Sequence, residues 1–238
     1  MDYLADHIGL LARVADASIL IPLIALLIRR QYITGELRIL AAFVILVFLR
    51  NLITEILSAY RIHNIIFYNW FVIFFYLNTA YLYARLLKGR IRQYFIPISC
   101  MLLVGLSMLE YDTMLNPKTV MFNSYAHPLS GLFTIVLVLA FYFQVLESLQ
   151  IPNIKRDPYF WFSSGALLYY TGTLLVYVFS RYTLSVSPEI DMQRQYWSID
   201  CLLSIIFYLF MAVGIWFTGP AGHTRKRSTA KMRIISNL

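Results

Sequence analysis

The sequence predicts an all-α membrane protein, a bundle of seven transmembrane helices with its N-terminus outside the cell and its C-terminus in the cytoplasm. The first reason is composition, because 60% of the 238 residues are hydrophobic and only 13% are charged, whereas soluble domains are about 25% charged. The second is that the apolar residues gather in seven long runs. The third is that the basic residues between these runs lie mostly on one side of the predicted membrane.

Each apolar run approaches the roughly 20 residues that a helix needs to cross the hydrocarbon core. Pro22 lies inside the first run and is expected to kink that helix. Asp157 and Pro158 place an N-cap and a first-turn proline at the start of the sixth run, and Gly219 and Pro220 are expected to end the seventh helix. The predicted spans are residues 10–28, 37–58, 65–87, 94–109, 128–146, 158–179 and 196–217, of which the fourth is the shortest.

Lysine and arginine determine the predicted orientation, because the cytoplasmic loops of membrane proteins carry an excess of both. Fourteen of these residues fall on one side of the membrane, namely Arg29, Arg30, Arg38, Arg85, Lys88, Arg90, Arg92, Lys155, Arg156, Arg225, Lys226, Arg227, Lys231 and Arg233. Only four fall on the other side, namely Arg61, Lys118, Arg181 and Arg194. We therefore expect residues 1–218 to form the seven-helix domain and residues 219–238 to form a basic cytoplasmic tail. This topology explains the net charge of +8 by contact with the lipid bilayer, without a nucleic-acid partner.

Charged and polar side chains within the spans are the first candidates for a functional site, because a charge inside the membrane costs about 2.5–3.5 kcal/mol. Arg13 and Asp16 are three residues apart and share a face of the first span, and Asp200 and Ser204 share a face of the seventh. Because successive spans run in opposite directions, these groups reach a similar depth in the outer half of the membrane. The candidate ligand-binding residues are Arg13, Asp16, Arg50, Asn51, Glu55, Asn69, Asp200 and Ser204.

Two interpretations of this outer polar cluster are open. In the structural one, charged groups on neighbouring helices pair and lock the bundle. Arg50 lies about two turns below the outer end of the second span, and it is expected to pair with Asp16 or Asp200. In the functional one, the cluster forms the floor of an outward-facing pocket. The two are compatible, because a binding pocket also needs fixed walls.

The sixth span has a different pattern, which combines small residues with tyrosines. Gly165 and Gly172 are seven residues apart and therefore share a face of the helix, and small residues allow two membrane helices to approach closely. We expect this face to pack tightly on a neighbouring helix. The alternative interpretation is that Tyr169 and Tyr170 line a cavity.

Several kinds of site are not expected. No lysine lies within a predicted span, so the chain offers no attachment point for a retinal Schiff base and no cofactor is predicted. The four histidines (His7, His63, His127 and His223) lie at the ends of spans or in loops, which is an unfavourable arrangement for a metal site. Cys100 and Cys201 both lie in apolar runs, which gives no disulfide framework.

Two stretches in the last third of the chain resemble a known group of proteins. They are PYFWFSSGALLYYTGTL at residues 158–174 and YWSIDCLLSIIFYL at residues 196–209. Both resemble small seven-helix membrane proteins of Bacteroidetes-type bacteria, a largely uncharacterised group that tends to be encoded beside, or fused to, sensor histidine kinases. The chain departs from the commonest pattern of that group at Ser163 and Asp200. The resemblance implies a multi-pass protein of the bacterial inner (plasma) membrane with a histidine kinase as its signalling partner.

These features favour a receptor-like or sensor-like membrane module, in which a ligand at the outer polar cluster changes the helix packing and a partner receives the signal. The second hypothesis is a small solute transporter, with three spans on each side of a linking fourth span. That function requires a polar path through the whole membrane. The third is a lipid-modifying enzyme that uses Asp16, Glu55 and Asp200. Enzyme activity is not favoured, because the usual hydrolase motifs are missing from the sequence.

Overall fold

The computed structural model describes residues 2–60, 65–109, 125–148, 154–186 and 190–218. Within these ranges the chain is helical apart from its turns, as the sequence predicts. The long helices are α1 (Asp2–Ser18), α2 (Leu20–Ile28), α3 (Leu37–Ala59), α4 (Ile65–Leu86), α5 (Ile96–Leu109), α7 (Ala126–Ser148), α8 (Pro158–Val186) and α9 (Ile190–Trp216). Short helical turns are η1 (Arg30–Tyr32), the π-helical η2 (Ile91–Phe95) and η3 (Ile154–Arg156). The predicted basic tail, residues 219–238, lies outside the described residues.

Five helical segments of the described chain are both long and apolar enough to cross a membrane. These segments are Leu10–Ile28, Leu37–Ala59, Ile91–Leu109, Ala126–Glu147 and Ser198–Trp216. They coincide with the first, second, fourth, fifth and seventh predicted spans, which supports the prediction of a helical membrane protein. The third and sixth predicted spans are α4 and α8, which have sufficient length at 22 and 29 residues but carry more tyrosine and hydroxyl side chains.

The first predicted span is interrupted, as expected from its proline. Helix α1 ends at Ser18 and helix α2 begins at Leu20. Pro22 has no N–H to donate to the carbonyl of Ser18, four residues earlier, and its ring crowds that carbonyl. The hydroxyl of Ser18 turns back and donates to the carbonyl of Ala15 at 2.6 Å. The structure thus shows an interruption of the helix where the sequence predicts a kink, and the kink itself stays a prediction.

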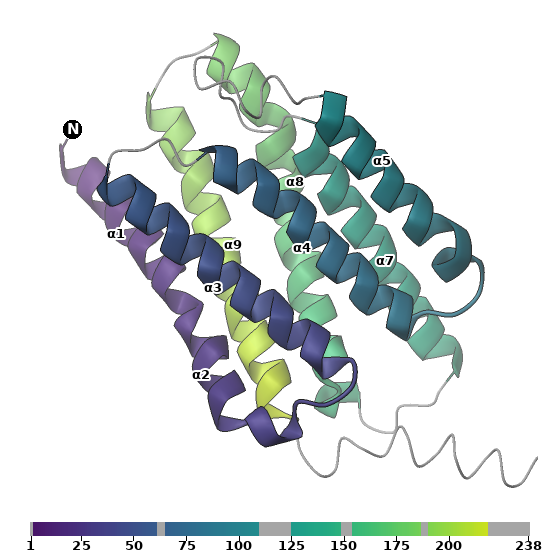
Figure 1. Ribbon diagram of the computed structural model, residues 1–238. Coiled ribbons are helices and arrows are strands. Elements are labelled where there is room, and N and C mark those ends of the chain that lie inside the picture. Colours follow the sequence, from purple (N-terminus) through teal and green to yellow (C-terminus); the bar gives the residue numbers. More distant parts are fainter. Residues whose placement is uncertain (1, 61–64, 110–124, 149–153, 187–189, 219–238) are drawn as a thin grey trace, which may run out of the picture.

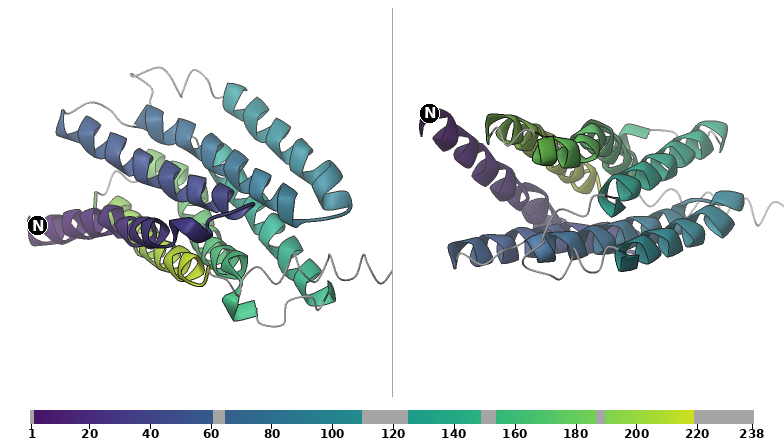
Figure 2. Two further views of the ribbon diagram at one scale, coloured as in Figure 1. Left: turned by 60° about the horizontal axis from the view of Figure 1, so that its bottom comes forward. Right: turned by 90° about the horizontal axis from the view of Figure 1, so that it is seen from above.

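The helices form two layers (Figure 1, Figure 2). One layer contains α3, α4 and α5, and the other contains α1 with α2, then α9, α8 and α7. The layers meet along both sides, where α2 contacts α3 and where α7 contacts α4. Helices α1 to α4 and α7 to α9 therefore enclose a common interior, and α5 packs outside them against α4 and α7.

Three basic connections lie at the same end of the bundle, the lower end in Figure 1, and we call this the basic end. They join α2 to α3, α4 to α5 and α7 to α8, and they contain or flank nine of the basic residues predicted to be cytoplasmic. Arg85 lies 3.7 Å from Glu36 across two of these connections. The guanidinium of Arg29 stacks over the ring of Trp216 at 4.8 Å, which ties α2 to the end of α9.

The tightest helix contact joins α8 to α9, and glycine makes it possible. A Cβ atom on Gly165 would lie 2.8 Å from the Cβ of Phe210, and one on Gly172 would lie 2.5 Å from a methyl group of Leu203. Gly214 of α9 makes a similar close contact with α8, because a Cβ atom there would lie 2.9 Å from the backbone oxygen of Pro158. The packing role predicted for Gly165 and Gly172 is confirmed.

Replacement of Gly165 with alanine is therefore expected to lower the stability of the bundle, by about 1–3 kcal/mol, because the added methyl group meets the fixed base of the Phe210 side chain. The matched control is Gly105→Ala in α5, where a Cβ atom would meet nothing within 4 Å and helix propensity gains up to about 1 kcal/mol. Melting temperatures of the two purified variants in one detergent test this expectation. Equal melting temperatures would contradict it.

Candidate functional site

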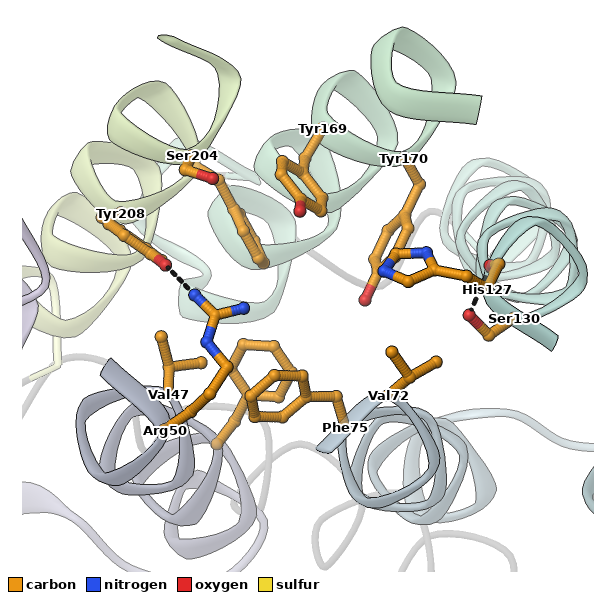
Figure 3. A pocket seen from close by; sticks show the side chains of 12 residues that line it. Val47, Arg50, Val72, Phe75, His127, Ser130, Tyr169, Tyr170, Ser204 and Tyr208 are labelled. Atoms are coloured by element: carbon orange, nitrogen blue, oxygen red, sulfur yellow. Dashed lines mark hydrogen bonds between the residues drawn. The ribbon is translucent and has the colours of Figure 1, made fainter. Parts of the chain in front are cut away.

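A cavity lies between the two layers, and five helices line it (Figure 3). Its volume is about 40 Å³, which is room for about three water molecules. The lining residues are Phe43, Val47 and Arg50 of α3, Val72 and Phe75 of α4, His127 and Ser130 of α7, Tyr169 and Tyr170 of α8, and Ser204, Phe207 and Tyr208 of α9. Polar groups from both layers thus converge on one small space.

The guanidinium of Arg50 enters this cavity from α3 (Figure 3). Its Nε and Nη2 atoms donate to Oδ1 of Asn51 at 3.0 and 2.8 Å, and Nη2 also lies 3.4 Å from the hydroxyl of Tyr208. The guanidinium carbon stands 5.5 Å from the ring centre of Phe75, within the range of a cation–π contact. Arg50 therefore faces the interior of the bundle and connects α3 with α4 and α9.

Asn51 holds the Arg50 side chain in this direction. Asn51 is buried, and its amide nitrogen donates to the backbone oxygen of Asp16 on α1 at 3.2 Å. With the nitrogen used in this way, the amide oxygen is turned toward the guanidinium. The position of Arg50 is thus set by a neutral amide that is itself fixed by the backbone of a third helix.

The wall formed by α9 carries polar groups at every fourth residue, namely Asp200, Ser204 and Tyr208. This spacing places them on one face of the helix, and Ser204 and Tyr208 line the cavity. Asp200 is buried next to it, where its carboxylate accepts a hydrogen bond from the hydroxyl of Tyr169 at 3.1 Å. The Asp200 carboxylate thus lies one hydrogen bond from a residue that lines the cavity.

Helix α7 contributes a second polar stripe at spacings of three and four residues. The hydroxyl of Ser130 donates to the carbonyl of His127 at 2.7 Å, and the hydroxyl of Thr134 donates to the carbonyl of Ser130 at 2.8 Å. All three side chains are buried. In Figure 3 the His127 ring lies beside Tyr170, opposite Arg50.

Aromatic rings close the cavity toward the basic end. The ring of Phe43 lies 5.6, 5.4 and 5.9 Å from the rings of Phe75, Phe162 and Phe207. Phe43 lies seven residues before Arg50 on α3, and Phe162 lies seven residues before Tyr169 on α8. Both helices begin at the basic end. The two phenylalanines therefore lie about 10 Å closer to that end. We call these four rings the aromatic layer.

Beyond the aromatic layer, polar side chains are paired across helices. The hydroxyls of Tyr83 and Ser163 lie 2.8 Å apart between α4 and α8, and those of Tyr142 and Ser164 lie 2.6 Å apart between α7 and α8. Gln144 of α7 accepts a hydrogen bond from the backbone N–H of Lys88 at 2.8 Å and donates one to the carbonyl of Leu86 at 3.1 Å. These bonds stabilise the half of the bundle near the basic end.

The eight candidates from the sequence occupy three kinds of position. Arg50 and Ser204 line the cavity, and Asn51 and Asp200 each lie one hydrogen bond from a residue that lines it. Asn69 is fully buried on α4 outside the cavity lining. The side chains of Arg13, Asp16 and Glu55 are exposed on the surface of the bundle. The sequence-based pairing of Arg50 with Asp16 or Asp200 stays a prediction.

Several cavity residues were not among the candidates. His127 does lie at the end of a span, but its side chain is turned inward. Tyr208 continues the stripe of Asp200 and Ser204 by one more turn, and this spacing was visible in the sequence. The same is true of the stripe from His127 through Ser130. Tyr169 and Tyr170 were not among the eight candidates, but the alternative interpretation of the sixth span, in which they line a cavity, is confirmed.

The chemistry of the cavity is that of a binding site. It presents one guanidinium, one imidazole and five hydroxyl groups among aromatic walls, the usual combination of apolar surface with a few oriented polar groups. Within the described ranges, no group of three or more His, Cys, Asp or Glu side chains is arranged to hold a metal ion.

Arg50→Ala is expected to destabilise the protein by about 1.5–3 kcal/mol, because the hydrogen bonds of a charged donor to Asn51 and Tyr208 are lost inside the bundle. Arg38→Ala removes the same side chain from an exposed position on the same helix, and its effect should stay within about 0.5 kcal/mol. Thermal unfolding in one detergent compares the two variants. A larger loss for Arg38→Ala would show that the Arg50 contacts contribute little.

Comparisons with models of protein families, with curated proteins and with solved structures find no match to this chain. Its function must therefore be inferred from the cavity and its surroundings.

Proposed function

We propose that this protein is a receptor-like membrane module of the bacterial inner membrane, which binds a small ligand in the cavity at Arg50 and signals to a partner such as a histidine kinase. The observation that carries the proposal is the cavity itself, in which four of the five lining helices direct polar groups at one small space that the aromatic layer closes toward the basic end. A site of this kind can bind a ligand without passing it through the membrane.

The proposed topology has seven spans, with α4 and α8 as the third and sixth. Its support is the clustering of basic connections at one end of the bundle (Figure 1), because basic loops favour the cytoplasm. With the basic end inside, Arg50 lies 13 residues from the inner end of α3 and nine from its outer end, about 20 and 14 Å along the helix. The cavity then opens nearer the outer surface.

Helix α9 provides the connection between cavity and cytoplasm. Ser204 and Tyr208 of α9 line the cavity, whereas Trp216, two turns further on, stacks under Arg29 at the basic end. Close packing at Gly165 and Gly172 makes α8 move together with α9. A ligand that shifts α9 therefore also shifts the contact between Trp216 and Arg29 at the basic end. A cytoplasmic partner bound at that end would respond to this change. The resemblance to proteins encoded beside sensor histidine kinases supports a kinase as that partner.

The signalling role is tested without a ligand by changing the α8–α9 contact. Gly172→Ala should alter the autophosphorylation rate of the co-encoded histidine kinase in proteoliposomes, since a packing change of about 1 kcal/mol shifts the ratio of two states roughly fivefold. Gly105→Ala, on the outer face of α5, should leave the rate unchanged. A kinase that responds neither to the wild-type protein nor to Gly172→Ala would rule out this role.

A transporter is the second candidate, because the first three and last three spans surround the cavity while α5 packs outside them. The aromatic layer argues against it, since Phe43, Phe162 and Phe207 are at most 4% exposed and leave no polar path to the basic end. Uptake of a defined solute into proteoliposomes, lost in Asp200→Asn, would favour transport over signalling.

The topology is tested with single cysteines in a variant without Cys100 and Cys201. A cysteine at Tyr60, which is 75% exposed at the end of α3 opposite the basic end, should react with a membrane-impermeant thiol reagent in cells whose outer membrane has been made permeable. A cysteine at Lys88, in a basic connection, should react only after the inner membrane is opened. The reverse result would invert the proposed orientation.

A further inference from the structure

We infer that the side chain of Arg29 binds the phosphate of an anionic phospholipid in the inner leaflet of the membrane. The site lies at the basic end, where α2 and α9 meet. The inference rests on the proposed orientation, which places this end in the cytoplasm, but it does not depend on the receptor role. Three observations carry it: the free donors of Arg29, its place on an outward-facing stripe of α9, and the charge of the basic end.

The guanidinium of Arg29 is held in place by aromatic rings. Its central carbon lies 4.8 Å from the ring centre of Trp216 and 5.8 Å from that of Tyr32. An aromatic ring attracts a cation through its face, whereas the N–H groups of a guanidinium lie in its own plane. The rings therefore fix the position of the charge without accepting its N–H groups.

The chain provides no anion for this guanidinium within its described part. Among these residues Arg29 has no ion-pair partner, and its buried Nε atom has no hydrogen-bond acceptor. The side chain as a whole is partly exposed, so its terminal nitrogens reach the surface. Residues 219–238, which follow α9, contain neither aspartate nor glutamate. The acceptor that a charged donor requires is therefore expected to come from outside the chain.

Arg29 lies at the end of an outward-facing stripe of α9. Leu202, Leu209 and Trp216 are exposed and follow one another at seven-residue intervals, which places them on one face of the helix. The segment Ser198–Trp216 is apolar enough to cross a membrane, so we expect lipid chains to cover this face. Tryptophan side chains gather at the level of the lipid headgroups. Arg29 therefore lies at the depth of the phosphate, with Leu209 about 10 Å deeper along the helix.

Helix α2 extends this apolar surface. Ile24, Leu27 and Ile28 are exposed on the turns of α2 just before Arg29, and α2 packs against α9. A phospholipid whose phosphate binds Arg29 can thus place its acyl chains along two neighbouring helices. The headgroup and the chains are recognised by adjoining parts of one surface, as a membrane lipid requires.

The charge of the basic end favours an anionic lipid. Its three connections contain or flank nine basic residues but only three acidic ones, Glu36, Glu147 and Asp157. Glu36 is paired with Arg85, and Asp157 accepts a hydrogen bond from the backbone N–H of Tyr159 at 3.1 Å. Phosphatidylcholine would bring its ammonium group to this positive surface, whereas phosphatidylglycerol brings a net negative charge. The site should therefore prefer phosphatidylglycerol.

An acidic face of a cytoplasmic protein is the other occupant that such a charge could attract. The position of Arg29 favours the lipid. Its guanidinium lies over Trp216, on the outward face of a membrane-spanning helix, and not at the tip of a connection. The experiment below gives different results for the two occupants.

The test uses Trp216 as a reporter in the full-length protein. The protein is placed in phosphatidylcholine nanodiscs that contain brominated phosphatidylglycerol or brominated phosphatidylcholine at the same mole fraction, since bromine on an acyl chain quenches a tryptophan that it contacts. Of the four tryptophans, Trp216 is isolated by subtracting the signal of Trp216→Phe. We expect phosphatidylglycerol to bind about fivefold more tightly, which corresponds to the roughly 1 kcal/mol that one basic residue contributes near an anionic surface.

The deciding variant is Arg29→Gln, which removes the charge and should abolish this preference. Its matched control is Arg38→Gln, which removes one charge from an exposed position on α3 at the same end and should retain most of the preference. If Arg29→Gln does not fold, Arg29→Lys takes its place. It keeps the charge but lacks the planar fork that matches a phosphate, so the preference should fall.

The inference is overturned if the two brominated lipids quench Trp216 equally, a result that would leave the basic end to an acidic protein partner. It is also overturned if Arg29→Gln and Arg38→Gln lower the preference by the same amount, because the attraction would then belong to the whole surface. If sodium phosphate at constant ionic strength relieves the quenching, the ligand is free phosphate and not a lipid. The measurement involves neither the cavity nor a kinase, so its failure leaves the receptor role to its own test.

Discussion

The rest of the structure depends on the burial of one guanidinium among membrane helices. A charge in the hydrocarbon region is costly unless the protein replaces the lost water. Here the replacement comes from Asn51, Tyr208 and the ring of Phe75. Because Asn51 is anchored to the backbone of α1, the environment of Arg50 joins α1, α3, α4 and α9. A displacement of any of these helices changes the environment of the charge, which couples their positions energetically.

The bundle is organised differently on the two sides of the aromatic layer. Toward the basic end, the buried Tyr83 and the partly buried Tyr142 are each paired with a serine on α8, and Gln144 binds two backbone groups. Membrane hydrogen bonds of this kind contribute about 0.6 kcal/mol each on average, so together they favour one arrangement of the helices. On the other side, polar groups surround a cavity. A hydrogen-bonded base beneath a polar pocket is the arrangement expected of a binding site with fixed walls.

The sequence predicts the spans, the kink at Pro22 and the close contact at Gly165 and Gly172, because span length, proline and glycine have local causes. It identifies the right helix faces only in part. Asn51 is buried whereas Glu55, one turn later, is exposed, although both are polar residues in an apolar helix. In water the polar face of a helix is its outer face, but in lipid both faces are apolar. The direction of a single polar residue therefore depends on tertiary packing, which one sequence does not reveal.

The position of α9 explains how a small pocket can affect a distant surface. An isolated side-chain contact near the cavity would be absorbed by local adjustment, but at Gly165 and Gly172 the backbone of α8 lies directly against α9 side chains, namely those of Phe207, Phe210 and Leu203. Close-packed surfaces do not deform gradually, so under the proposed function a change at Tyr208 would displace α8 and α9 together. Near the basic end, the ring centre of Trp161 on α8 lies 5.6 Å from that of Phe210 and 6.2 Å from that of Phe217. The Trp161 indole also donates a hydrogen bond to the carbonyl of Lys155 at 2.7 Å. The contacts are thus continuous from Arg50 to Lys155, which is the route that the proposed signalling function requires.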